Sequence, residues 1–115
     1  MIGEFEYLIL TAAASLGEEA YGAAIRAGIE EATGRVCSIG ALYTTIDRLE
    51  GKGLITSWMG EATAERGGRA KRMVRLTAAG ETAAKEFYET VTRISRGASW
   101  VSNRTVVREA IAWLR

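Results

Sequence analysis

The chain has 115 residues, 48% of them hydrophobic and 25% charged, a balance that is typical of one folded domain rather than a disordered segment. Its 15 basic and 14 acidic residues give a net charge of +1, so a surface for nucleic acid can only come from the distribution of these charges. The absence of histidine and the single cysteine exclude an internal disulfide and remove the usual zinc ligands and the commonest general base. We therefore expect no metal, no cofactor and no enzymatic activity. The acidic N-terminal segment MIGEFEYLIL and the lack of an apolar run of ~20 residues predict a cytoplasmic protein without a membrane partner.

Two amphipathic helices are predicted before residue 35. Apolar residues three and four positions apart give residues 5–16 one hydrophobic face, and Gly17 ends this helix. The acidic pair at 18–19 suits the start of a second helix, whose apolar positions run from Tyr21 until Gly34.

A third helix is predicted from Ser38, which can cap its first turn, to Gly51. Its buried stripe is expected to consist of Ile39, Leu42, Ile46 and Leu49. The outward face then starts with small residues and ends with basic ones: Gly40, Ala41, Tyr43, Thr44, Thr45, Arg48 and Lys52. Small side chains let a helix approach the floor of the DNA major groove, hydroxyls reach bases or phosphates, and basic groups neutralise phosphates. Alternatively, the tyrosine is half-buried packing and the threonines fill a solvated face.

A β-hairpin is predicted after Gly53, because LITSWMGE and KRMVRLT are rich in β-branched and aromatic residues and flank the segment ATAERGGRA. Trp58 is expected to pack at the base of this hairpin. On the second strand, alternation directs Val74 and Leu76 to the core. It directs Lys71, Met73 and Arg75 to the other face. Basic residues gather around the tip: Arg66, Arg69, Lys71, Arg72 and Arg75. Such a tip suits the DNA backbone or minor groove, whereas the alternative is a solvated hairpin whose arginines aid solubility.

A long fourth helix is predicted after Thr77, with an apolar seam at Ala83, Ala84, Phe87, Val91 and Ile94. Gly97 and Ser99 interrupt it, and a last amphipathic segment follows at 106–114. Three helices and a hairpin are the order of a winged helix-turn-helix, a mainly α fold of the α+β type. We therefore expect a DNA-binding domain at residues 1–76 and a C-terminal helical region at 77–115.

Four segments of the chain resemble the PadR family of winged-helix transcriptional regulators: GEFEYLIL, AYGAAIR, SIGALYTTIDRLEGKGLI and ERGGRAKRMVRLTAAG. The resemblance covers roughly the first three-quarters of the chain. It implies a dimeric DNA-binding repressor whose C-terminal helical region forms the dimer. It places Ser38, Gly40, Ala41, Tyr43, Thr44 and Arg48 in the recognition region and Arg66, Arg69, Lys71 and Arg72 in the wing. One departure is Thr44, which stands where many members have proline after the tyrosine.

The apolar seam of the fourth helix independently suggests a second copy of the chain, because the small core is already supplied by the first three helices and the hairpin. The expected interface residues are Phe87, Val91, Ile94, Trp100, Ile111 and Leu114. Two recognition helices spaced by ~34 Å or a multiple would read a near-palindromic operator. The alternative is that the segment at 106–114 folds back and covers the seam within one chain.

Two further features leave alternatives open. Trp58, Trp100 and Trp113 could line a pocket for a small aromatic effector near the interface, or they could simply pack. Cys37 directly precedes the cap of the third helix and is either a redox-sensitive thiol beside Arg35 or a small buried thiol.

Three classes of function remain to be compared. The wing charge and the small-residue start of the third helix favour a homodimeric repressor that binds specific DNA. The alternative is a winged-helix module for protein–protein interaction, for which fewer wing arginines and a more apolar outer face are expected. An enzyme would need the acidic pairs at 18–19 and 30–31 to gather in a pocket, whereas their helical positions are typical of a solvated face.

Overall fold

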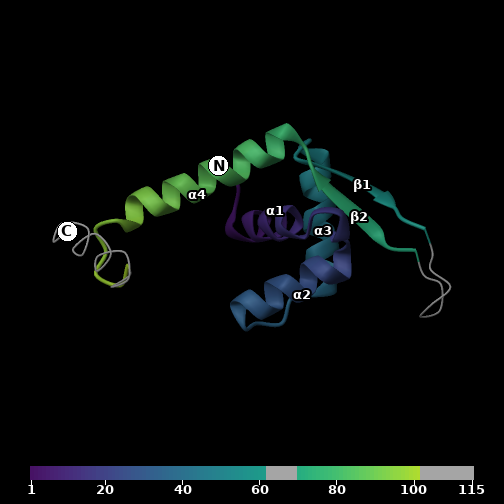
Figure 1. The fold of residues 1–115 in the computed structure, drawn as a ribbon, viewed down its shortest axis with the longest axis horizontal. Helices are drawn as coiled ribbons and strands as arrows, with labels where there is room; N and C mark the ends of the chain where they lie inside the picture. The colour runs from purple at the N-terminus through teal and green to yellow at the C-terminus, as the bar shows by residue number, and fades with distance from the viewer. Residues whose placement is uncertain (62–69, 102–115) are drawn as a thin grey trace, which may run out of the picture.

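The computed structural model of the chain describes residues 1–61 and 70–101. Its elements are α1 (Glu4–Leu16), the short 3₁₀ helix η1 (Gly17–Glu19), α2 (Gly22–Thr33), α3 (Ile39–Gly51), β1 (Ile55–Met59), β2 (Arg72–Leu76) and α4 (Ala78–Ser95). In Figure 1, α1, α2 and α3 form a cluster, from which the β1–β2 wing extends to one side and α4 to the other. This arrangement is a winged helix with an additional C-terminal helix, as the sequence predicts. No helix in the described ranges is long and apolar enough to span a membrane.

Local side-chain chemistry explains where three of the helices begin. Glu6 accepts a hydrogen bond from the Gly3 amide at 3.0 Å and so satisfies the backbone at the start of α1. Ser38 accepts from the amide of Ala41 at 3.3 Å at the start of α3, and Thr77 caps α4 in the same way. The predicted caps of α3 and α4 are therefore confirmed.

The start of α2 differs from the prediction. The acidic pair at 18–19 forms η1, and α2 begins only at Gly22. The intervening chain is extended because it pairs with the wing: the Ala20 carbonyl accepts from the Val74 amide at 2.9 Å, and Tyr21 bridges to Met73. A long-range pairing therefore overrides the local preference of acidic residues for a helix start.

The hydrophobic core joins the three-helix cluster to the wing. Its largest fully buried side chains are Ile9, Leu10, Ile25, Leu42, Ile46, Leu49 and Ile55. The antiparallel register places Ile55 opposite Leu76 and Ser57 opposite Val74. Val74 is buried whereas Lys71 and Arg75 are exposed, which confirms the predicted alternation at these positions, while Leu76 and Met73 are both half-buried.

The buried stripe of α3 is shifted from the predicted one. It consists of Leu42, Thr45, Ile46 and Leu49, whereas Ile39 is 56% exposed. The predicted inward position of Ile39 and the predicted outward position of Thr45 are therefore wrong. Thr45 tolerates burial because its hydroxyl donates to the Ala41 carbonyl at 2.8 Å, which leaves its methyl group to pack.

The first turn of α4 is anchored tightly to the end of the α3–β1 connection. The Thr77 amide donates to the Leu54 carbonyl at 3.0 Å, and the Thr77 hydroxyl donates to the Gly53 carbonyl at 2.7 Å. A Cβ atom at Gly80 would collide with the Leu54 carbonyl oxygen, so only glycine permits this approach. Further along the helix, Phe87 stacks on Tyr7 of α1 with ring centroids 4.6 Å apart.

Candidate nucleic-acid interface

Four small residues lie at the exposed start of α3 and its cap, beside the exposed side chain of Ile39. Ser38, Gly40, Ala41 and Thr44 are all exposed, and Thr44 lies one turn before Arg48 on the same side of the helix. Arg48 is also exposed and forms no ion pair among residues 1–61 and 70–101, although its charge helps to hold the pKa of Glu6 below its ordinary value. The helix runs regularly from Ile39 to Gly51, and Thr44 lies within it. This face combines close approach, hydroxyl groups and an exposed guanidinium.

Tyr43 lies between the exposed face and the core. Its side chain is half-buried, and its hydroxyl group lies where a Cβ atom would stand at Gly22, so α2 and α3 approach closely through this pair. The Arg72 guanidinium carbon is 6.0 Å from the centroid of the ring. Packing between helices is therefore the main contact of Tyr43 in the described structure.

The turn before α3 is held by two charged residues of α2. The Cys37 amide donates to a Glu30 carboxylate oxygen at 2.8 Å, and the Cys37 carbonyl accepts from Arg26 Nε at 2.7 Å. Arg26 and Glu30 are themselves 3.8 Å apart and occupy positions i and i+4. This clamp fixes the direction in which α3 leaves the turn. In the sequence, only the i, i+4 spacing of Arg26 and Glu30 indicated that these two residues would interact.

Cys37 has the features of a buried structural thiol. Only 6% of the residue is exposed. Burial raises the pKa of the Cys37 thiol, Glu30 raises it further, and Arg26 acts in the opposite direction. A redox-sensitive thiol needs exposure and a lowered pKa, and this geometry provides neither.

Two of the basic wing residues lie over aromatic rings of the chain. Lys71 is exposed and its Nζ lies 4.2 Å from the centroid of the Tyr21 ring. The guanidinium carbon of Arg75 lies 5.4 Å from the centroid of the Trp58 ring. Trp58 is 43% exposed, so the expectation that Trp58 packs at the base of the hairpin is wrong. The predicted wing residues Arg66 and Arg69 lie outside the described residues.

Arg72 differs from its neighbours, because it is directed at α3. Its Nη2 atom lies 2.7 Å from Asp47 Oδ1 and 3.6 Å from Glu50 Oε1. Arg72 shares a strand face with the buried Val74, two positions away, so the alternation of the strand turns it inward. The expectation of a free phosphate-binding side chain at the tip therefore does not fit the position of Arg72.

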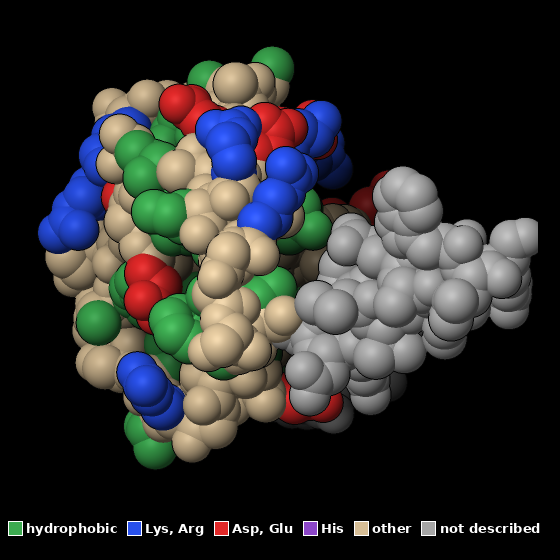
Figure 2. Space-filling view, turned by 90° about the vertical axis from the view of Figure 1, so that its left-hand side faces the viewer, with side chains coloured by type: hydrophobic (Ala, Val, Ile, Leu, Met, Phe, Trp, Pro, Cys, Tyr) green, Lys and Arg blue, Asp and Glu red, His purple; other side chains and the backbone are tan. Residues whose placement is uncertain are grey.

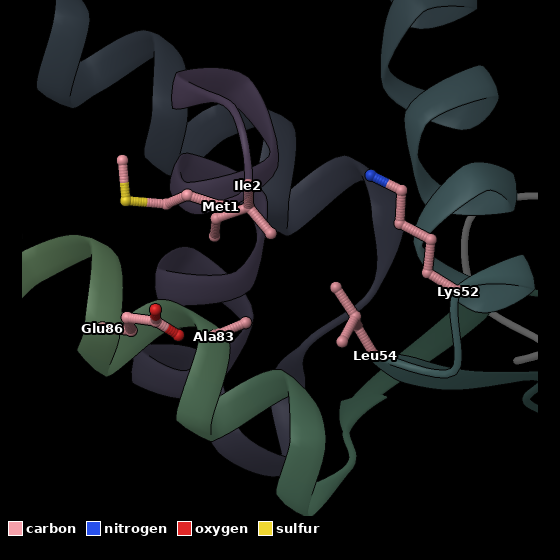
Figure 3. Close-up of a pocket in the computed structure, with 6 residues that line it drawn as sticks. All are labelled: Met1, Ile2, Lys52, Leu54, Ala83 and Glu86. Atoms are coloured by element: carbon pink, nitrogen blue, oxygen red, sulfur yellow. The ribbon is translucent and has the colours of Figure 1, made fainter.

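Lys52 is also engaged within the chain. Its Nζ donates to a Glu6 carboxylate oxygen at 2.7 Å, so it is not the free basic residue that its place on α3 predicts. Figure 3 shows Lys52 beside a hollow of about 260 Å³ that is lined by Met1, Ile2, Lys52, Leu54, Ala83 and Glu86. The hydrogen bond from the Gly3 amide, and then that from Lys52, hold the pKa of Glu6 below its ordinary value.

Some of the basic side chains are therefore held by acidic residues of the same chain, whereas others in the described ranges are free to contact DNA. Figure 2 shows basic side chains interspersed with acidic and hydrophobic ones on the face that it presents.

Within residues 1–61 and 70–101, no group of three or more Cys, His, Asp or Glu side chains could hold a metal ion.

The second half of α4 carries exposed apolar side chains. The exposed residues are Tyr88 (59%), Val91 (44%) and Ile94 (81%) on the helix and Trp100 (84%) after it. Phe87, predicted at the same seam, is half-buried against Tyr7 and so is partly covered within the chain. The predicted interface residues Ile111 and Leu114, together with Trp113, lie outside the described residues.

Between α1 and α4 lies a second hollow of about 260 Å³. Aromatic, apolar and charged side chains line it: Tyr7, Thr11, Ala14, Leu76, Glu81, Ala84, Lys85 and Tyr88. None of the tryptophans in the described ranges contributes to this lining.

The order and arrangement of the helices and the two-stranded wing are those of a winged-helix DNA-binding protein. The model of the transcriptional regulator PadR-like family matches residues 9–86 of the chain. Because this match spans more than half of the 115 residues, the chain belongs to the PadR-like family of transcriptional regulators. Membership confirms the resemblance in the sequence, and the family is not one of enzymes.

Solved structures agree with this assignment. A transcriptional regulator from Clostridium thermocellum is 26% identical, with a TM-score of 0.64 over 84% of this chain and 92% of that one. RosR from H. salinarum is 30% identical, with a TM-score of 0.61 over 96% and 91% of the two chains. A PadR-like transcription factor from Bacteroides fragilis shares the fold at 22% identity, with a TM-score of 0.64 over 85% and 89%. No curated protein matches the chain by sequence.

Proposed function

We propose that the chain is a sequence-specific repressor that binds a near-palindromic operator as a homodimer. The observation that carries this proposal is the exposed face of α3, where small and hydroxylated side chains precede the exposed Arg48. In this proposal Ser38, Gly40, Ala41 and Thr44 enter the major groove, while Arg48 and Lys71 bind phosphates. Arg66 and Arg69 of the wing add further phosphate contacts, whereas Tyr43 supports α3 from its flank.

Dimerisation is supported by the exposed apolar side chains of α4, which no other residue within 1–61 and 70–101 covers. Val91 and Ile94 lie one turn apart on a helix whose second half projects from the three-helix cluster (Figure 1), and Trp100 follows it. A second copy of α4 is the simplest cover for this seam, because a two-fold axis matches identical apolar faces. Such an axis also pairs the two α3 helices for a palindromic operator.

A small aromatic effector is proposed to release the protein from DNA. The hollow between α1 and α4 has Tyr7 and Tyr88 on its walls and lies beside the proposed dimer seam. An aromatic compound held there would contact the helix that joins the two copies, and could thereby change the spacing of the recognition helices. Saturable changes in intrinsic fluorescence on titration with aromatic compounds would support this, and the absence of any would contradict it.

The decisive experiment measures DNA binding by fluorescence anisotropy over a series of salt concentrations. The probes are the duplex upstream of the chain's own gene, a scrambled duplex, and a duplex selected from a randomised library by repeated binding. We expect the protein to bind the upstream duplex or the selected duplex more tightly than the scrambled duplex. This tighter binding should depend steeply on salt concentration.

Arg48→Ala is the variant that tests the recognition face. It should weaken specific binding by about tenfold and make the salt slope shallower by about one, the value for removal of one phosphate-neutralising charge. Arg93→Ala, in the last turn of α4, removes the same charge from another surface and should leave binding unchanged. Equal, weak binding of the wild-type protein to all three duplexes would instead favour the protein-interaction module.

A further inference from the structure

Four polar side chains join the wing to the recognition helix outside the hydrophobic core. This helix–wing network consists of Asp47 and Glu50 on α3, Ser57 on β1 and Arg72 on β2. Arg72 contacts Asp47 at 2.7 Å and Glu50 at 3.6 Å, and its Nε and Nη2 atoms lie 3.3 and 3.2 Å from Ser57 Oγ. One Glu50 oxygen accepts from both the amide and the hydroxyl of Ser57, at 2.8 and 2.6 Å. Every one of these contacts links α3 to a strand or links the two strands.

Arg72, at the centre of the helix–wing network, is more buried than Asp47 at its edge. The Arg72 side chain is 21% exposed, whereas that of Asp47 is 67% exposed. Since a guanidinium has fixed, planar donors, contacts to three acceptors restrict its direction more than one ion pair would. The pairing of Val74 with Ala20, by contrast, holds β2 to the start of α2 rather than to α3.

We infer that Arg72 is a positioning residue for DNA binding: it fixes the wing against α3 through Asp47, Glu50 and Ser57, and neutralises two carboxylates near the recognition face. This inference rests on the proposed function. DNA that meets α3 and the wing together needs both surfaces at one angle, and binding is weakened when that angle has to be restored on binding.

The direction in which Asp47→Ala changes DNA affinity distinguishes this role of Arg72 from that of an ordinary phosphate ligand. If Arg72 were a phosphate ligand, Asp47 would compete with DNA for it. Asp47→Ala would then remove a competitor and a negative charge, and binding would tighten. If Arg72 positions the wing, Asp47→Ala weakens binding even though it removes a repulsive charge.

The test compares wild type, Asp47→Ala, Arg72→Ala and the double variant on the duplex that the wild-type protein prefers. We expect each single variant to weaken binding by about fivefold, and the double variant to be no weaker than Arg72→Ala alone. Glu31→Ala, which removes an exposed acidic residue from α2, is the matched control and should leave binding unchanged or slightly tighter. Tighter or unchanged binding of Asp47→Ala would overturn the inference.

A measurement without DNA keeps this test separate from the proposed function. Hydrogen exchange of the β1 and β2 amides should be faster in Arg72→Ala than in wild type, because the wing is held to α3 less firmly. Unchanged exchange would overturn the inference even if DNA binding fell. Failure of wild type to prefer any duplex would contradict the proposed function, and the exchange result would then decide alone whether Arg72 positions the wing.

Discussion

Helices α3 and α4 differ in how much of their surface the chain itself covers. α3 is covered by its own chain on its inner side and tied at its end by Lys52 to Glu6 and by Glu50 to Ser57. α4 is tied at its start through Thr77 and near its middle through Phe87, whereas beyond Phe87 it exposes Val91 and Ile94. The chain therefore positions α3, the proposed DNA-binding helix, through its own contacts, whereas it leaves an apolar face of α4 exposed that the proposed dimer would cover.

The largest expected effect comes from placing a charge on the uncovered seam. Val91→Asp should raise the dimer dissociation constant by at least about 100-fold, because a carboxylate would be buried without a partner between two copies of α4. Sedimentation velocity over a range of protein concentrations measures it. Thr92→Asp places the same charge at the neighbouring exposed position of α4 and should dissociate the dimer far less. Equal behaviour of the two variants would contradict the proposed seam.

The anchored end of α4 can be broken at Gly80. Gly80→Ala should lower the free energy of unfolding by about 2–4 kcal/mol, because the new Cβ atom collides with the backbone oxygen of Leu54. Gly28→Ala is the matched control: nothing lies within 4 Å of a Cβ there, and the helix should gain about 0.5–1 kcal/mol. Urea denaturation at one fixed protein concentration compares them, since dimerisation would otherwise shift the apparent stability. A stable Gly80→Ala variant would show that the first turn of α4 is not fixed as described.

The tie between α1 and the end of α3 predicts a dependence on pH. The pKa of Glu6 is lowered by the Gly3 amide and Lys52, so its ionised form stabilises the folded chain. This stabilisation is complete above the ordinary pKa of 4.5 and disappears as the pH falls through the lowered value. Wild type should therefore be more stable than Glu6→Gln at neutral pH, and the difference should shrink in acid. Urea denaturation of both proteins over a pH series measures it, and a difference that stays constant from neutral to strongly acidic pH would contradict this role of Glu6.

The smallest effects should separate two neighbouring threonines of α3. Thr44→Val should change affinity for the preferred duplex by about three- to tenfold while leaving stability unaltered, because Thr44 is exposed on the proposed DNA-facing side. Thr45→Val should leave affinity unaltered and change stability by less than about 1.5 kcal/mol, since Thr45 is buried and its hydroxyl serves Ala41. Anisotropy and urea denaturation on both variants check the pair, and the reverse pattern would reassign the face of α3.

The limits of the sequence prediction are visible within α3 itself. The series Ile39, Leu42, Ile46, Leu49 and the observed series with Thr45 both have helical spacing, so periodicity could not choose between them. The hydrophobicity of Ile39 favoured the wrong one. Thr45 lies on the buried face of α3, and the hydrogen bond to the Ala41 carbonyl removes much of the cost of burying its hydroxyl.

Charged side chains were harder to assign than apolar ones. Lys52 and Arg72 carry the charge that a DNA surface needs, yet their partners are 46 and 25 residues away along the chain. Such pairings have no local pattern. For Arg72, the alternation that buries Val74 did contain the necessary signal, because residues two apart on a strand share a face.

The order of the elements, the caps Ser38 and Thr77, the alternation in β2 and the small residues at the start of α3 were all predictable from the sequence, because each depends on neighbouring residues. The tertiary structure alone decided which basic groups are engaged within the chain, where α2 begins and which half of α4 is covered. These depend on contacts between residues distant in sequence, such as Ala20 with Val74 and Tyr7 with Phe87, which no local periodicity encodes.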